Sequence, residues 1–303
     1  PTPTPTETRT RTRTRTRTRT RTETRTRTSA FFVQAKTAQS LVSGNVFFNG
    51  PRAGINANDG FGGGDEISHN LVFSTCRESG DHGPFNSWDR QPFLTTVRTG
   101  APSMQMQWRE IHHNFFIDNY SPQENPSPNP NPDPDPDPNP DPDPDANPNP
   151  GPNPNPNPNP YPNQENVDND DGSAYYHTHD NFLVYGGNGM KNDFGGHDNH
   201  HYGNVYAYVG QGLGVCSQQP GHEDYFYGNK LVTTGTNVGG FACGGDAKTV
   251  VHDNAYYTAS GSISECKMDL KAWQAEGNDK GSTVAALPSD ETIIGWARSM
   301  LGF

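Results

Sequence analysis

The sequence contains little hydrophobic material and no long apolar run. Hydrophobic residues make up 29% of the 303 residues, and no stretch approaches the ~20 apolar residues that a membrane-spanning helix requires. We therefore expect no membrane span. The chain begins at Pro1, without a Met or a signal peptide, from which we expect a mature or truncated form.

Cysteine is scarce, and basic residues are missing from one long segment. The four cysteines include no Cys-x-x-Cys pair, which argues against a structural zinc site. Between Pro122 and Asp171 there are eleven acidic residues and no basic ones. Residues 1–28 have the opposite balance, because nine Arg and two Glu give a net charge of +7. This arm alternates Arg with Thr and has no aromatic residue, so we expect no nucleic-acid partner.

A recurring motif, in which an Asn precedes three or four apolar or aromatic residues, organises the rest of the chain. Its members are Asn45, Asn70, Asn114, Asn181, Asn204, Asn229 and Asn254, separated by 25, 44, 67, 23, 25 and 25 residues. Periods in the low twenties are typical of a solenoid with one coil per repeat, and the short apolar runs are typical of strands. The sequence thus predicts an all-β parallel β-helix with a ladder of stacked amides at an inward corner.

Two steps of the motif are longer than one coil. The step of 44 is interpreted as two coils of 22, with FLTTV at residues 93–97 as a degenerate copy between them. The step of 67 falls to 21 when residues 122–167 are removed. About 230 residues remain outside the two dipeptide repeats, which at ~23 residues per coil predicts nine or ten coils.

These patterns divide the chain into five segments. They are an extended Thr/Arg arm at 1–29, the first half of the β-helix at 30–121, an X-Pro insertion at 122–167, the second half at 168–266 and a C-terminal cap with helices at 267–303. Proline at nearly every even position from 126 to 162 predicts that the insertion is polyproline II.

The C-terminal segment predicts two helices. Residues 269–282 indicate a short helix and turn, and Ser289 is the expected N-cap of a final helix with Glu291 in its first turn. We expect the apolar residues of the final helix to cover the open end of the coil stack, as solenoid ends require. They are Ile293, Ile294, Trp296, Ala297, Met300 and Leu301.

Three of the cysteines recur at similar places in the repeat. Cys216, Cys243 and Cys266 lie 12, 14 and 12 residues after the preceding Asn of the motif, so we expect them near one another on successive coils. We favour a Cys216–Cys243 disulfide, and a Cys243–Cys266 pairing stays open. Disulfides indicate an extracellular, oxidising compartment.

Two polar stretches, residues 50–92 and 189–201, hold the candidate catalytic residues. Asp81 lies 11 residues after its motif Asn and Asp193 lies 12 after its own, so we expect both on one side of the solenoid. Two carboxylates across a groove can act as acid and base in glycoside hydrolysis, and Asp81 and Asp193 are our pair. His82 or His197 would act as the proton shuttle for this acid–base pair.

The remaining polar residues suggest substrate and cation binding. Arg90 or Lys191 would hold an acidic sugar, or stand near the base position of a lyase. Ca²⁺ is the one cofactor that the sequence suggests, on Asp65, Glu66 and Asp89. Histidines at 177–179 and 197–201 are metal-ligand types, but their spacing identifies no metal. The structural alternative is that Gly-flanked Asp, Asn and His fix turns.

Four segments carry a family resemblance: GPRAGIN, DHGPFNSWDR, KNDFGGHDN and LKAWQAEGNDKGS. They resemble segments of right-handed parallel β-helix proteins related to polysaccharide lyases and glycoside hydrolases. The resemblance covers nearly all of residues 30–121 and 168–303, and it implies a right-handed coil and, more loosely, polysaccharide handling. The dipeptide repeats instead resemble the hydroxyproline-rich, O-glycosylated stalks of algal extracellular-matrix and flagellar-hair glycoproteins.

The resemblance of the repeats implies covalently attached glycans. The expected O-glycosylation sites are Thr10, Thr12, Thr14, Thr16, Thr18, Thr20, Pro134, Pro136, Pro138, Pro154 and Pro156. Asn119 begins an Asn-Tyr-Ser sequon for N-glycosylation.

The sequence supports two hypotheses for the function. The arm of +7 and the insertion region of −11 are complementary, which suits head-to-tail association of copies of the chain. Our leading hypothesis is therefore a structural subunit of an extracellular glycoprotein filament. The alternative is a secreted polysaccharide lyase or glycoside hydrolase with flexible glycosylated tethers, and a carbohydrate-binding module without turnover lies between the two.

Overall fold

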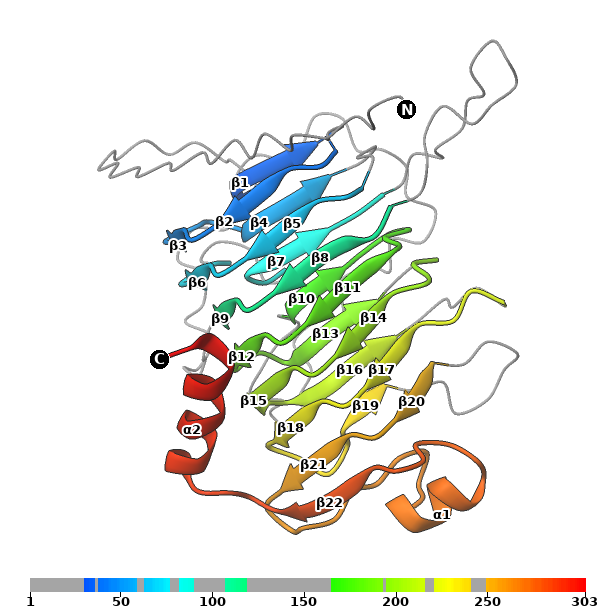
Figure 1. The fold of residues 1–303 in the computed structure, drawn as a ribbon. Helices are drawn as coiled ribbons and strands as arrows, with labels where there is room; N and C mark the ends of the chain where they lie inside the picture. Colours follow the sequence, from blue (N-terminus) through cyan, green and yellow to red (C-terminus); the bar gives the residue numbers. More distant parts are fainter. Residues whose placement is uncertain are drawn as a thin grey trace, which may run out of the picture.

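The repeats form successive coils of a solenoid built from three parallel sheets (Figure 1). The computed structural model describes residues 30–35, 38–58, 63–76, 82–89, 107–118, 165–192, 195–215, 221–240 and 249–303. Each strand pairs in parallel with the equivalent strand of the neighbouring coils. The predicted all-β parallel fold is confirmed, whereas the handedness of the coil stays a prediction.

Each full coil contributes one strand to each sheet. Sheet 1 consists of β1 (Ala30–Ala35), β4 (Ala53–Asn58), β7 (Phe85–Ser87), β10 (Glu165–Asn169), β13 (Asn188–Asn192), β16 (Gln211–Val215) and β19 (Gly239–Gly240). Sheet 2 consists of β2 (Leu41–Ser43), β5 (Glu66–Ser68), β8 (Arg109–His112), β11 (Tyr176–His179), β14 (His200–Tyr202), β17 (Tyr225–Tyr227) and β20 (Val250–His252). Sheet 3 consists of β3 (Val46–Phe48), β6 (Leu71–Phe73), β9 (Phe115–Ile117), β12 (Phe182–Val184), β15 (Val205–Val209), β18 (Lys230–Thr233), β21 (Ala255–Thr258) and β22 (Thr283–Ala286).

The predicted Asn ladder is present at the corner between sheets 2 and 3. The Oδ1 atom of each following Asn accepts the backbone N–H of the Asn one coil before it at 3.0 Å, and also that residue's Nδ2 at 3.0–3.2 Å. From Asn70 onward, each Nδ2 also donates to a carbonyl of sheet 2, as Asn204 does to Thr178 O at 2.9 Å. The ladder ends where Asn254 N–H donates to Ser282 Oγ. The buried amides therefore satisfy one another.

The residue before each ladder Asn has a left-handed backbone. These residues are Gly44, His69, His113, Asp180, Gly203, Gly228 and Asp253, with φ between 51° and 71°. Gly adopts this conformation without steric cost, and Asp and His are enriched among the other residues that do so. The turn from sheet 2 to sheet 3 thus explains why Gly, His or Asp always precedes the Asn.

The step of 44 residues is one coil rather than two. Leu71 of β6 pairs directly with Phe115 of β9, which leaves no rung between them. Our reading of residues 93–97 as a separate copy is therefore wrong, because the extra length lies in the connections on both sides of β7, at residues 74–84 and 88–108. The step of 67 is also one coil, as predicted, since β9 pairs with β12. The described residues form seven three-strand coils followed by β22, not nine or ten coils.

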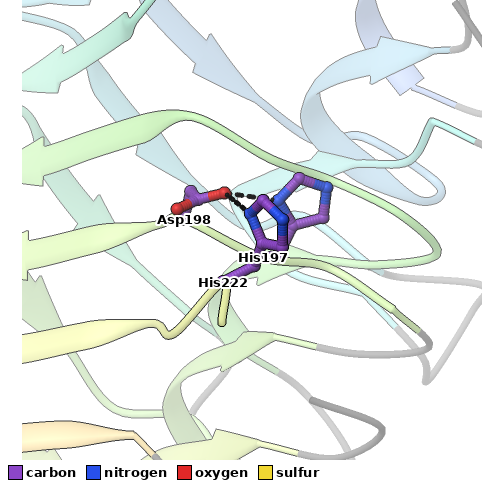
Figure 2. Close-up of side chains that lie close together, drawn as sticks. All are labelled: His197, Asp198 and His222. Carbon is purple, nitrogen blue, oxygen red and sulfur yellow. Dashed lines mark hydrogen bonds and ion pairs between the residues drawn. The ribbon is translucent and has the colours of Figure 1, made fainter. Parts of the chain in front are cut away.

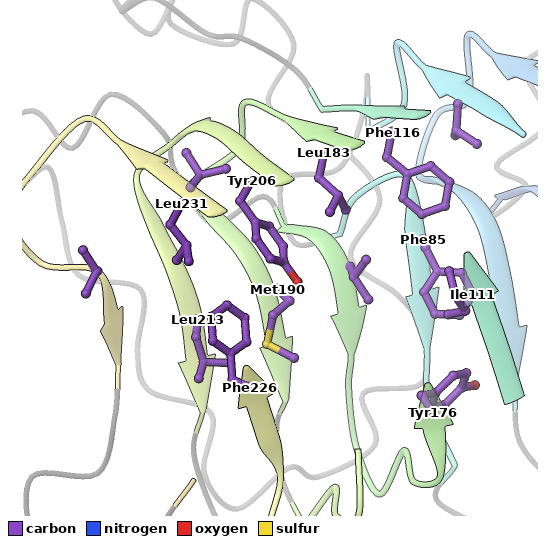
Figure 3. Close-up of a cluster of buried hydrophobic side chains, with 14 of the residues drawn as sticks. Phe85, Ile111, Phe116, Tyr176, Leu183, Met190, Tyr206, Leu213, Phe226 and Leu231 are labelled. Atoms are coloured by element: carbon purple, nitrogen blue, oxygen red, sulfur yellow. The ribbon is translucent and has the colours of Figure 1, made fainter. Parts of the chain in front are cut away.

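Alternate residues of the strands point inward and fill a continuous core (Figure 3). Along sheet 1 this column includes Ile55, Phe85, Val167, Met190 and Leu213, which are 0–1% exposed. Sheet 3 adds Phe116, Leu183, Tyr206 and Leu231 from the opposite side. Burial of each such side chain contributes about 1.5–3 kcal/mol, so coil-on-coil stacking stabilises the rod throughout its length.

The two predicted helices are present, but the second is not where we expected it. Helix α1 (Leu270–Ala275) buries Leu270 and Trp273 in the main core at the C-terminal end. Helix α2 (Asp290–Leu301), with Ser289 as its N-cap, packs on the outer face of sheet 3 against β12 and β15 (Figure 1). The expectation that its apolar residues cover the end of the stack is wrong, because they pack with outward residues such as Phe182 and Val205. Ile294 remains 48% exposed.

Several predicted features lie outside the described residues. They are residues 1–29, the proline tract, Asn119, and all eleven predicted O-glycosylation sites. The C-terminal boundary of the insertion shifts, however, because β10 begins at Glu165 and places residues 165–167 in the solenoid. No helix in the described ranges is long and apolar enough to span a membrane.

Candidate functional site

Three of the six predicted catalytic residues can be placed. Asp81, Arg90 and Asp193 lie outside the described residues, so the Asp81–Asp193 acid–base pair stays a prediction. His82 and Lys191 lie near each other beside sheet 1, since Lys191 acts on the pKa of His82. His197 belongs to a different cluster, before β14.

His82 is a buried neutral imidazole. It is 3% exposed, and its Nε2 contacts the guanidinium of Arg52. Burial, reinforced by the positive charges of Arg52 and Lys191, lowers the pKa of His82 to about 3. A group that stays deprotonated above this pH is a poor general acid near neutrality.

Lys191 lies beside a buried carboxylate that the sequence did not single out. Its Nζ is 3.3 Å from Asp168 Oδ1 and 3.9 Å from Asp170 Oδ1, and Asn86 Nδ2 donates to Asp168 Oδ2 at 2.7 Å. Asn86, Asp168 and Lys191 are register neighbours on three successive strands of sheet 1. Burial raises the pKa of Asp168, and Lys191 opposes that rise. The arrangement is a polar column that joins three coils.

His197 forms a compact cluster with Asp198 and His222 (Figure 2). Asp198 Oδ2 lies 2.8 Å from Nδ1 of His197 and 2.8 Å from Nδ1 of His222. The first two residues precede β14, and His222 precedes β17 on the next coil. The sequence pointed to the histidines at 197–201 as metal-ligand types, but His222 lies 24 residues from Asp198 and was not expected to join them.

The outer face of sheet 2 carries a column of stacked rings, which we call the ring face. It consists of His112, His179, Tyr202, Tyr227 and His252, one from each of five successive coils. Neighbouring rings are 4.9–5.1 Å apart and 4–14° from parallel. Because the ring planes face one another along the rod, nitrogen and hydroxyl edges rather than ring faces meet the solvent. The sequence shows the His-x-His pair at 177–179 but not the register that stacks these rings.

Glu110 adds a charged centre to the ring face. Its carboxylate is 3.0 Å from His177 Nδ1 and 3.3 Å from His179 Nε2, and its side chain is 38% exposed. Burial alone would raise the pKa of Glu110, but hydrogen bonds from the two imidazoles lower it to about 2. Burial opposes protonation of His179, yet Glu110 and Asp180 raise the pKa of that imidazole. This site can exchange protons and can bind hydroxyl or carboxylate groups.

The residues suggested for Ca²⁺ do not meet in one cluster. Asp65 accepts a hydrogen bond from Ser40 N–H at 2.9 Å, whereas Glu66 faces outward, 3.7 Å from His112 Nε2. Asp89 follows β7 and is buried. Within the described ranges, only His197, Asp198 and His222 group closely enough to hold a metal ion.

The cysteines are described only in part. Cys76 is a buried free thiol, and burial raises its pKa. Cys266 is disulfide-bonded, which favours a pairing that includes Cys266 over the Cys216–Cys243 pairing that we expected. Cys216 and Cys243 themselves lie outside the described residues.

No family model, curated protein or solved structure matches this chain. The relation to carbohydrate-active enzymes therefore rests on the sequence resemblance alone.

Acid should destabilise the solenoid through a second buried imidazole, His201. It points inward from β14 and is 1% exposed, and burial, with His200 and His177, lowers its pKa from 6.5 to about 3. The unfolded chain binds this proton more tightly, so stability is full above pH 6.5 and falls as the pH drops toward 3. We expect His201→Gln to reduce the slope of unfolding free energy against pH by about 1.4 kcal/mol per unit in this window.

Urea unfolding at several pH values between 4 and 7 measures that slope. Ile111→Val in sheet 2 provides the control, because it loosens the same core without removing a titratable group. An equal slope in His201→Gln and the unmodified chain would contradict the assignment.

Proposed function

We propose that this chain is a structural subunit of an extracellular glycoprotein filament, in which copies associate head to tail. The observation that carries the proposal is the exposed apolar surface on β3, the first strand of sheet 3 among the described residues. At the C-terminal end, α1 and β22 continue the core and close the last coil. At the N-terminal end, β1, β2 and β3 are each the first strand of their sheet among the described residues.

The N-terminal end also presents apolar side chains. Val46 is 55% exposed and Phe48 is 44% exposed, and Phe48 stacks on Phe73 of the next coil at 5.3 Å. These residues continue the outer face of sheet 3, whose middle part is covered by α2. Further along the rod, helix α2 shields the apolar residues of this face from solvent. We therefore infer that a second copy of the chain shields Val46, Phe48 and Phe73 in the same way.

The polar groups beside sheet 1 fit a structural role better than a catalytic one. His82 is held neutral against Arg52, and Lys191 is held by two carboxylates of β10 and the residue after it. Both engage residues of the solenoid itself. In the filament, the Thr/Arg arm and the acidic proline insertion would reach neighbouring copies and carry the O-glycans, as the sequence suggests.

Replacement of Phe48 tests the proposed contact. We expect Phe48→Lys to shift the purified, glycosylated protein from polymers to monomers in sedimentation velocity, because a charge would have to be buried at the contact. Ile294→Lys is the matched control, since Ile294 is 48% exposed on α2, over the middle of sheet 3 and away from both ends of the rod, and should tolerate the change. Polymers that persist unchanged in Phe48→Lys would contradict the contact.

The ring face favours a second candidate, a secreted polysaccharide lyase or hydrolase. Glu110 and His179 form a partly buried carboxylate–imidazole pair, and Tyr202 stacks on His179 at 4.9 Å. The His179 imidazole would bind the carboxylate of an acidic sugar and donate a proton, and Glu110 would hold that imidazole in place. Release of sugar from acidic polysaccharides that is lost in Glu110→Gln, and kept in Glu66→Gln, would favour this candidate over the filament.

A further inference from the structure

The cluster of His197, Asp198 and His222 offers ligand atoms of a defined kind. Two imidazole nitrogens and one carboxylate oxygen lie within 4.8 Å of one another, and the two imidazole rings are 5.1 Å apart with their planes 60° apart (Figure 2). The nitrogens therefore approach one oxygen from different directions, as ligands around a single ion do.

We propose that these three residues bind a divalent transition-metal ion, with Zn²⁺ as the simplest case. Zn²⁺ binds imidazole nitrogen and carboxylate oxygen at about 2.0–2.2 Å in tetrahedral geometry. Neighbouring ligand atoms then lie about 3.3 Å apart, which follows from those bond lengths. The nitrogen–oxygen distances here are 2.8 Å, so the ligands need to separate by only about half an ångström.

The surroundings allow that small movement and leave room for further ligands. His222 has a side chain that is 56% exposed, while those of His197 and Asp198 are each 26% exposed. The exposed ring can swing outward while the other two ligands stay fixed on their strand connection. One protein ligand fewer than a closed tetrahedral site leaves at least one position for water or another molecule.

The donor set selects the class of ion. Ca²⁺ and Mg²⁺ prefer oxygen ligands, whereas imidazole suits Zn²⁺, Cu²⁺ and Ni²⁺. The ion would also link two successive coils, because Asp198 precedes β14 and His222 precedes β17. Metal binding would therefore stabilise the rod locally as well as create a site on its surface.

A hydrogen-bonded cluster without metal is the competing explanation, in which both imidazoles simply donate to Asp198. The chain contains a matched pair of that kind, because His252 Nδ1 lies 2.7 Å from Asp253 Oδ2 and Asp253 has the same left-handed backbone as Asp198. Within the described ranges, no third ligand joins that pair. His252 thus serves as the control residue.

Isothermal titration of the full purified chain with ZnCl₂, after dialysis against chelator, tests the proposal. We expect one Zn²⁺ per chain, displacement of protons from any protonated imidazole, and no saturable binding of CaCl₂. His222→Ala should weaken the Zn²⁺ affinity by on the order of 100-fold, since it removes one of three ligands, and His252→Ala should leave it unchanged. Asp198→Asn should also weaken binding.

Two readouts separate loss of the site from loss of the fold. The unfolding temperature should rise with ZnCl₂ in the unmodified chain and in His252→Ala but not in His222→Ala. Co²⁺ should give an intense visible absorption band only in the first two proteins. Absence of stoichiometric Zn²⁺ binding, or equal losses in His222→Ala and His252→Ala, would overturn the proposal.

Discussion

Replacing one central ladder residue, Asn181→Ala, is expected to destabilise the solenoid by about 3–5 kcal/mol. Asn181 is fully buried, and its Oδ1 accepts Asn114 N–H and Asn114 Nδ2, each at 3.0 Å. Its own Nδ2 donates to Ile111 O and to Asn204 Oδ1. Alanine would remove these hydrogen bonds between three coils and leave the buried Asn114 N–H without its acceptor, and an unsatisfied buried group costs about 1–3 kcal/mol. Chemical denaturation of the purified variant measures the loss.

The ladder supplies its own control in Asn45, the first member. Asn45 N–H and Nδ2 donate to Asn70 Oδ1, and no described residue donates to its Oδ1. Asn45→Ala should therefore cost clearly less than Asn181→Ala. If the two substitutions cost the same, the ladder would not be the continuous stabilising element that its geometry indicates.

Lys191→Met should have an effect of similar size for a different reason. The substitution removes the cation beside Asp168, which is 0% exposed, and removal of one partner of a buried ion pair typically costs about 3–5 kcal/mol. Denaturation at neutral pH should show this loss, because a carboxylate would then remain charged in the interior or have to take up a proton.

The double variant Asp168→Asn/Lys191→Met provides the control. An amide at position 168 can still accept the hydrogen bond from Asn86, and it carries no charge to leave unpaired. We expect the double variant to recover most of the stability lost in Lys191→Met. No recovery would mean that Lys191 acts through other contacts.

The fold was predictable from local patterns, but the coil count was not. A Gly, His or Asp before each Asn, and a strand after it, specify both the turn and the ladder. The pattern therefore predicts which residues pair between neighbouring coils. The step of 44 residues was misread because length alone does not distinguish two coils from one coil with a long connection. The direct Leu71–Phe115 pairing decides between them.

The position of α2 shows a second limit. We assigned its apolar residues to the end of the stack because solenoids need caps. However, strands such as β15 are apolar on both faces, with burial at four of the five positions of Val205–Val209. Continuous apolar runs in the strands of sheet 3 indicate that its outer face must also be buried, and α2 buries it.

The candidate sites depend on contacts between coils, which spacing measured along the chain describes poorly. Asp168 meets Asn86 across 82 residues, and Glu110 meets His177 across 67. The proline tract lies between the members of each pair, so neither pair shows the spacing of 23 or 25 residues that separates equivalent positions of neighbouring coils elsewhere. Nothing in the local sequence marks His222 as a partner of Asp198, because the two lie 24 residues apart and meet only when successive coils stack.

The most direct test of the filament account is to image the purified, glycosylated chain by negative-stain electron microscopy over a range of concentrations. We expect rods joined end to end into strings that lengthen as concentration rises, and single rods when Phe48 is replaced by Lys. Single separated rods at every concentration of the unmodified protein would contradict the account.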